Sequence, residues 1–172
     1  MQQDIVIRDF DDFDPGAIYA IIRHIYLTSD FMSDEFDRQY GDVASFKTHF
    51  SNLIARRGSF VLVALLDQRP VGYLTLERRQ ETRLQHTAWL NMGLIENQRR
   101  KGIGSMLVES AMDRAAKEGL IEIVYLMVRA DHTGAIGLYK KTGFEALVTL
   151  ERDTKIDHEY YDGVLMRRFL HK

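Results

Sequence analysis

The chain has 172 residues, of which 45% are hydrophobic and 28% charged, with a formal net charge of −2 and no cysteine. This charge argues against a dedicated nucleic-acid binder, which needs a concentrated basic surface, and the missing cysteines exclude disulfides, thiolate metal sites and a cysteine nucleophile. No apolar run approaches the roughly 18 residues of a membrane span, and the amino terminus lacks the basic-then-apolar layout of a signal peptide. We therefore expect a single cytoplasmic domain over residues 1–172, without nucleic-acid or membrane partners.

The first part of the chain predicts one strand and two helices. Residues 5–10 alternate apolar and polar side chains, which is typical of a strand. Asp14 and Pro15 are typical of a helix start, as N-cap and first helical residue, and this helix is expected to reach about Thr28. An acidic stretch that is irregular or marginally helical separates it from a second helix, expected at about 43–56.

Three antiparallel strands are expected next, at 59–66, 71–78 and 87–94, because these segments are rich in β-branched, aromatic and large apolar residues. Residues 67–70 form the turn between the first two strands. After a further helix, residues 121–128 are almost continuously apolar, which is typical of a strand covered on both faces. We expect this strand to run parallel to 87–94.

A last helix is expected at about 133–141, followed by strands at 144–150 and 159–169. Gly134 and Gly137 lie inside this helix, where each costs about 1 kcal/mol relative to alanine. We therefore expect a neighbouring segment or a ligand to approach them closely. The order of the elements predicts an α/β fold built on a mixed sheet.

The stretch 92–116 combines the end of a strand, a short basic loop and the start of a helix. Gly102 and Gly104 leave the backbone bare where the helix begins, and the first amides of a helix lie unpaired at the positive end of its dipole. A phosphate can approach such N–H groups closely. Three basic side chains add positive charge at the same place, those of Arg99, Arg100 and Lys101. The pattern favours a diphosphate-binding loop.

Other nucleotide-binding motifs do not fit this loop. The lysine of a phosphate-binding P-loop is absent, because Gly104 is followed by Ser105, and Leu107 stands where the dinucleotide fingerprint has its third glycine. On its own, the loop is equally compatible with a tight strand-to-helix turn that carries a solvated basic surface.

Two motifs together resemble the Gcn5-related N-acetyltransferase (GNAT) family. Arg99-x-x-Gly102-x-Gly104 matches that family's (Gln/Arg)-x-x-Gly-x-(Gly/Ala) motif. Downstream, A-I-G-L-Y-K-K-T-G-F at 135–144 resembles the second hallmark, in which a helix that begins with alanine carries a tyrosine and ends in Gly-Phe. The motifs occur in the family's order, separated by one helix and one strand, and the resemblance covers roughly residues 58–170.

The resemblance implies a GNAT-like fold, an α/β mixed central sheet with antiparallel N-terminal strands and a parallel pair that separates at the cofactor site, flanked by helices. It also implies acetyl-CoA as co-substrate, with its pantetheine arm in that opening and Met92 and Gly93 in a bulge before Leu94. The backbone N–H of Leu94 would then stabilise the oxyanion. The implied cofactor-binding residues are Met92, Gly93, Leu94, Arg99, Arg100, Lys101, Gly102, Ile103, Gly104, Ser105, His132, Ala135 and Tyr139.

Tyr139 matches the tyrosine that protonates the departing CoA thiolate in the family, although a tyrosine simply packed in the core is the alternative. A phenol with a pKa near ~10 can supply a proton to a thiolate whose conjugate acid has a pKa near ~8.5. His132 stands where the family often has an asparagine that binds the cofactor arm, and it offers both a donor and an acceptor.

The general base is left open by the sequence. The glutamate that serves as base in histone-type members is replaced by Ala88. His86, on the same face of the strand, is one candidate, because imidazole titrates near neutral pH. The others are Glu96, Asn91, Glu77 and a water chain.

The acceptor is expected to be a small-molecule or peptide amine. Residues 1–42 carry ten acidic and three basic side chains, which would favour a cationic amine if they wall the acceptor pocket and would otherwise form a solvated surface. Tyr160 and Tyr161 would equally suit an apolar amino acid.

We therefore expect an acetyl-CoA-dependent N-acetyltransferase that transfers the acetyl group directly, with no metal. The alternatives are an acyltransferase that uses another acyl-CoA such as succinyl-CoA, a non-catalytic CoA-sensing domain, and a nucleotide-binding module. Members of the family are often homodimers, although no interface is evident in the sequence.

Overall fold

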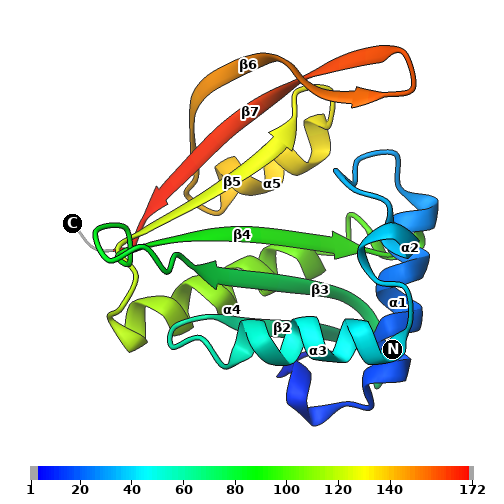
Figure 1. The fold of residues 1–172 in the computed structure, drawn as a ribbon. Helices are drawn as coiled ribbons and strands as arrows, with labels where there is room; N and C mark the ends of the chain where they lie inside the picture. Colours follow the sequence, from blue (N-terminus) through cyan, green and yellow to red (C-terminus); the bar gives the residue numbers. More distant parts are fainter. Residues whose placement is uncertain (1–3, 171–172) are drawn as a thin grey trace.

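A computed structural model of the chain describes residues 4–170 and is built on a seven-stranded sheet with the strand order β1-β2-β3-β4-β5-β7-β6 (Figure 1). Neighbouring strands are antiparallel except for β4 and β5, which are parallel, as the sequence predicted. The strands are β1 (Ile5–Asp9), β2 (Phe60–Leu66), β3 (Arg69–Arg78), β4 (Thr87–Leu94), β5 (Ile123–Arg129), β6 (Glu145–Ile156) and β7 (Glu159–Phe169).

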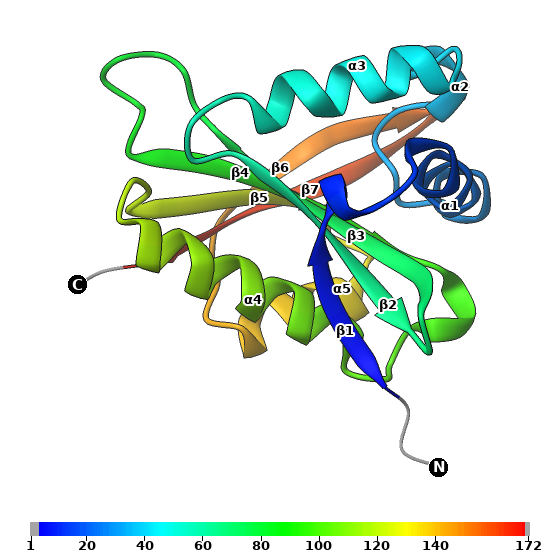
Figure 2. The same cartoon turned by 90° about the horizontal axis from the view of Figure 1, so that it is seen from below.

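Helices cover the two faces of this sheet unequally. On one face, α4 and α5 enclose a core with the inward residues of β2 to β5 and β7. On the other face, α1 and α3 enclose a second core with β2 and β3, and Figure 2 shows α3 and α4 on opposite sides of the sheet. The helices are α1 (Pro15–Thr28), α2 (Phe36–Gln39), α3 (Val43–Ile54), α4 (Ile103–Glu118) and α5 (Thr133–Lys141), with 3₁₀ turns η1 (Phe10–Asp12) and η2 (Glu96–Gln98).

Local signals in the sequence set several of these boundaries. The carboxylate of Asp14 accepts a hydrogen bond from the N–H of Ala17 at 3.0 Å, so it caps α1 as predicted. Gly119 ends α4 in the left-handed conformation, with φ of 67°, which suits glycine. The predicted bounds of β4, α5 and β7 are confirmed. The predicted turn at 67–70 is shorter than expected, because β3 already begins at Arg69.

Two expectations for the C-terminal half were wrong. β6 extends to Ile156 rather than 150, because it forms a long hairpin with β7. β5 was expected to be covered on both faces, but only one face is: Val124 and Leu126 are fully buried, whereas Met127 is 36% exposed. The reason is that α1 and α3 cover β2 and β3 and leave β5 uncovered on their side.

The parallel pair β4 and β5 separates partway along its length. The two strands pair from Thr87 with Ile123 to Trp89 with Tyr125. Within the described chain, the rest of β4 does not pair with β5. Figure 1 shows the two strands diverging toward their carboxyl ends. The separation opens the sheet beside Leu94, which is where the phosphate-loop motif begins.

Among residues 4–170, none of the helices combines the length and the apolar composition that crossing a membrane requires.

Candidate active site

The separated part of β4 presents free backbone groups to the opening. The N–H of Ile95 donates to the carbonyl of Val71 at 3.0 Å, in the same register that pairs Leu94 with Gly72. In an antiparallel pair of strands, every second residue is hydrogen-bonded to the partner strand. Gly93 therefore bonds to β3, as Ile95 does. Met92 and Leu94 direct their N–H and C=O groups the other way, toward β5. The backbone of Leu94 therefore has an N–H directed into the opening.

The expected bulge at Met92 and Gly93 is absent, because the register of β3 with β4 runs without a shift from Gly72–Leu94 to Arg78–Ala88. Packing accounts for the glycine instead. A Cβ at Gly93 would lie 2.7 Å from Cγ2 of Ile25 and 2.9 Å from Cε1 of Tyr73. Any side chain at position 93 would therefore push α1 off the sheet.

The loop between β4 and α4 has the geometry of an anion site. Gly102 is the N-cap of α4, with φ of 82° and no side-chain cap, so the first amides of a 16-residue helix are left without a partner from the chain. Arg100 also adopts a left-handed backbone, with φ of 63°. Lys101 donates to Oε1 of Gln98 at 2.7 Å, which holds the ammonium close to this helix start.

Gly104 has a packing role that the sequence did not reveal. A Cβ at this position would lie 2.5 Å from Cδ1 of Leu138, 3.3 Å from Cδ1 of Leu94 and 3.4 Å from Cε of Met92. The glycine thus lets α4, α5 and the separated end of β4 meet at one point. Ile103, next to it, is fully buried, and Ser105 is half-buried.

Tyr139 projects from α5 into the core beneath the opening and is 7% exposed. Its ring packs edge-on against Phe144 at 5.8 Å, and burial alone raises the pKa of its phenol well above the ordinary value. Tyr73 lies across the sheet beside Gly93; its pKa is raised mainly by burial and additionally by nearby phenols, including that of Tyr139. The two tyrosines belong to the cores on opposite faces of the sheet.

His132 and Ala135 belong to the start of α5. Nδ1 of His132 accepts from the N–H of Ala135 at 3.4 Å, so the histidine caps the helix and keeps its proton on Nε2. The ring stacks on Phe31 at 3.9 Å. Burial, followed by the charge of Arg99, lowers the pKa of His132.

Arg129 is a residue that the sequence analysis missed. Its guanidinium donates to both carboxylate oxygens of Asp131 and, at 2.6 Å, to the carbonyl of Asp30. The guanidinium carbon lies 4.8 Å from the centre of the Phe31 ring and 3.7 Å from that of Tyr161. The carboxyl end of β5 is thereby fastened to the segment after α1 and to the β6–β7 hairpin.

Replacing Arg129 with methionine is expected to destabilise the chain by about 1–2 kcal/mol, because the carbonyl of Asp30 and two aromatic faces lose their cationic partner. Urea unfolding measures this change. Arg167→Met is the matched control: Arg167 bonds the exposed carboxylate of Glu145, and such pairs contribute about 0–1 kcal/mol. Equal losses for the two variants would contradict the role of Arg129 as a clamp.

His86 cannot serve as the base that receives the acceptor's proton directly. It precedes β4, eight residues from Leu94, which corresponds to about 26 Å along an extended strand. Its strand face is also that of Ala88, which is buried against α4. Among the other candidates, Asn91 and Glu77 lie on the opposite face, with Gly93 and Trp89, because directly paired residues share a face.

A Cβ at Gly134 or Gly137 would meet no described atom within 4 Å, so no neighbouring segment requires these glycines. The close approach of a ligand to them stays a prediction. Two of the acidic residues before position 43 form ion pairs at separate places. Asp9 pairs with Arg114 of α4, whereas Asp37 pairs with Arg23 near the far end of α1, a helix about 21 Å long.

Within the described chain, no group of three or more His, Cys, Asp or Glu side chains could hold a metal ion.

Comparison with known proteins identifies relatives. The model of the acetyltransferase (GNAT) family matches residues 20–144. The chain is 30% identical over 116 residues to the L-amino acid N-acetyltransferase AaaT of Escherichia coli (strain K12), a match covering 67% of this chain and 72% of that protein. It is 31% identical over 109 residues to an N-alpha-acetyltransferase of Sulfurisphaera tokodaii, which covers 59% of this chain and 62% of that protein.

The fold is similar to a solved GNAT superfamily structure, the phosphinothricin acetyltransferase of Sinorhizobium meliloti in complex with AcCoA. The TM-score is 0.85, with 22% identity over 96% of this chain and 88% of that one. At this identity the likeness concerns the fold.

Proposed function

The chain belongs to the GNAT acetyltransferase family, and on that premise we propose that it transfers an acetyl group from acetyl-CoA directly to a primary amine of a small molecule or peptide. The observation that carries the proposal is the separation of β4 from β5 after Trp89, directly before the unpaired amides that begin α4. A pantetheine arm needs backbone partners, and a diphosphate needs a cluster of N–H groups and positive charge. Both are adjacent here.

The basic loop holds the diphosphate in this proposal. The first amides of α4 donate to phosphate oxygens at the positive end of the helix dipole, and Lys101 lies close to them through its bond to Gln98. The charge of Arg99, in this loop, also lowers the pKa of His132 at the start of α5. The cap that His132 makes leaves its Nε2–H free to donate to the cofactor arm.

Leu94 and Tyr139 act on the reacting atoms. The N–H of Leu94 donates to the thioester oxygen, and one preorganised donor of this kind lowers the barrier by about 3 kcal/mol. The amine nitrogen bonds to the acetyl carbon, the carbon–sulfur bond breaks, and its electron pair stays on sulfur. Tyr139 gives its phenolic proton to that thiolate. Its raised pKa keeps the phenol protonated at neutral pH, as a donor requires.

Water removes the proton from the acceptor amine. Asn91 is exposed on the same face as Gly93, two residues away, and its amide can orient a water molecule but cannot take up a proton. The carboxylate of Glu77 lies further along that face, opposite Trp89. A water chain from the amine past Asn91 to bulk solvent or Glu77 is the route that we propose.

Residues 1–172 act as one acetyltransferase domain in this proposal, since both cores and both motifs share a single sheet. We place the protein in the cytoplasm, because a chain without cysteine gains nothing from an oxidising compartment.

Release of free CoA from acetyl-CoA tests the function across a panel of polyamines, aminoglycosides, amino acids and peptides. Saturable turnover with one amine class is the expected result. Tight acetyl-CoA binding without turnover on any amine would instead indicate a CoA-sensing domain, and faster turnover with succinyl-CoA would indicate a different acyl donor.

A further inference from the structure

Before Gly93, which packs against Ile25 of α1, one face of β4 and β5 has no helix over it within residues 4–170. We call it the open face; it consists of Asn91 and Trp89 on β4 and Tyr125 and Met127 on β5. Trp89 and Met127 are each 36% exposed, Asn91 is exposed and Tyr125 is half-buried. These side chains leave an apolar and aromatic surface partly open to solvent. The open face also continues directly from Gly93 and the opening at Leu94.

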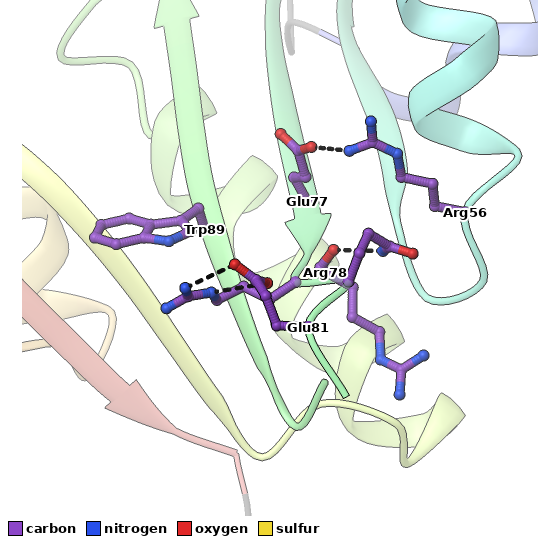
Figure 3. Close-up of a pocket in the computed structure, with 7 residues that line it drawn as sticks. Arg56, Glu77, Arg78, Glu81 and Trp89 are labelled. Atoms are coloured by element: carbon purple, nitrogen blue, oxygen red, sulfur yellow. Dashed lines mark hydrogen bonds and ion pairs between the residues drawn. The ribbon is translucent and has the colours of Figure 1, made fainter. Parts of the chain in front are cut away.

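A hollow of about 480 Å³ lies at the far end of the open face. Figure 3 shows Trp89 beside Glu77 and Glu81. Glu77 pairs with Arg56, and Glu81 pairs with Arg79. The indole lies 5.7 Å from the Tyr125 ring at an angle of 41°, so the two rings form one aromatic surface. Five of the seven residues that line the hollow are charged, and Arg78 donates to the carbonyls of Gln85 and Arg57 rather than to a carboxylate. The apolar contact that the hollow offers is therefore the indole of Trp89.

The distance from Gly93 to Trp89 sets the minimum length of an acceptor that contacts both the opening and the indole. Gly93 and Trp89 are four strand residues apart, which corresponds to about 13 Å. A free amino acid whose amine lies at the opening cannot touch Trp89. An extended peptide of about four residues can, because it rises by the same 3.3 Å per residue.

The direction of such a peptide follows from the other end of the open face. There Arg129 joins β5 to the carbonyl of Asp30, stacks on Phe31 and Tyr161, and so ties the segment after α1 to the β6–β7 hairpin. Chain leaving the opening in that direction would have to break these contacts. A lysine side chain acceptor carries chain in both directions, whereas an N-terminal amine carries it in one.

We propose that the acceptor is the N-terminus of a polypeptide, whose amine lies at the opening beside Leu94 and whose third to fifth residues lie on Trp89 and Tyr125. This inference rests on the proposed acetyl transfer and names its substrate class. An aromatic side chain near the fourth position packs on the rings of Trp89 and Tyr125.

Trp89 is the single tryptophan of the chain and therefore reports on this contact directly. The experiment uses two N-terminally acetylated peptides, a dipeptide and a hexapeptide with phenylalanine at position four. Each is titrated into the protein in the presence of CoA while the fluorescence emission of Trp89 is measured. A saturable blue shift with the six-residue peptide and none with the dipeptide is expected. No shift with either peptide overturns the proposal. So does a shift that depends on protein concentration alone, because a second copy would then cover the open face.

Kinetics separate this inference from the function on which it rests. We expect kcat/KM for a free hexapeptide with phenylalanine at position four to exceed kcat/KM for the corresponding amino acid amide. Trp89→Ala is expected to lower the ratio of these two kcat/KM values about tenfold. Leu147→Ala, which removes a similarly exposed apolar side chain from the outer strand β6, is expected to leave the ratio unchanged. Turnover of amino acid amides at a rate equal to that of the hexapeptide overturns the inference alone. Absence of CoA release with every amine overturns the proposed function as well.

Discussion

Gly104→Val is expected to weaken acetyl-CoA binding at least 100-fold while the chain remains folded. A Cβ here would lie 2.5 Å from Leu138 and 3.3 Å from Leu94, and a branched side chain extends further toward both. It would push α5 away from α4, so that the helix start and the Leu94 amide could no longer bind one ligand together. A 100-fold loss corresponds to about 2.7 kcal/mol of binding free energy. Overpacking costs about 1–3 kcal/mol, less than the stability of a typical domain.

Isothermal titration calorimetry with acetyl-CoA measures this loss, with thermal unfolding as the check that the variant is folded. Gly41→Ala is the control, because a Cβ at Gly41 would meet no described atom within 4 Å. Arg99→Ala provides a second variant that changes charge and leaves the Gly104 packing intact; we expect about tenfold weaker binding. Wild-type affinity in both variants would refute the assignment of the diphosphate to this loop.

The sequence predicted the elements well because periodicity and glycine positions are local signals. The apolar run of β5, the Asp14 cap and the glycine that ends α4 each depend on neighbours along the chain. The opening itself was inferred only from the family resemblance, since nothing local in 87–94 shows that hydrogen bonding to β5 stops at Trp89.

Contacts between distant segments could not be predicted in the same way. Arg129 meets Asp30 across 99 residues of chain, and the sequence offers no pattern that links them. Gly93 was read as a bulge because a glycine in a strand interior is typical of one, whereas the close packing of Ile25 and Tyr73 explains it. The uncovered face of β5 escaped prediction because a continuous apolar run is the same whether one face or two are buried.

Tyr139→Phe is expected to lower kcat about 100-fold while the KM for acetyl-CoA changes less than twofold. General acid catalysis contributes about 10²–10⁴-fold, and the substitution removes the donor while keeping the ring that packs on Phe144. Tyr19→Phe removes a hydroxyl from a ring that packs on Phe36 in the other core, and it is expected to leave kcat unchanged. A kcat equal to that of the wild type would remove Tyr139 from the mechanism.

The pH dependence of kcat gives an independent check on the same residue. Burial raises the pKa of Tyr139, so the phenol stays protonated and active as a donor until the pH exceeds its ordinary ionisation near ~10. Ionisation of Tyr139 should therefore not lower the kcat of the wild-type enzyme between pH 8 and about 10. The pH profiles of kcat for the wild type and Tyr139→Phe should have the same shape over this range. The free energy of unfolding should depend on pH in the same direction. Because the pKa of Tyr139 is raised in the folded state, its stabilising contribution is fully present below about pH 10 and is lost as the pH rises from there toward the folded-state pKa. A loss of kcat that begins near pH 8 in the wild type and is absent in Tyr139→Phe would mean that the phenol is more acidic than its burial allows, and that it ionises within the catalytic cycle.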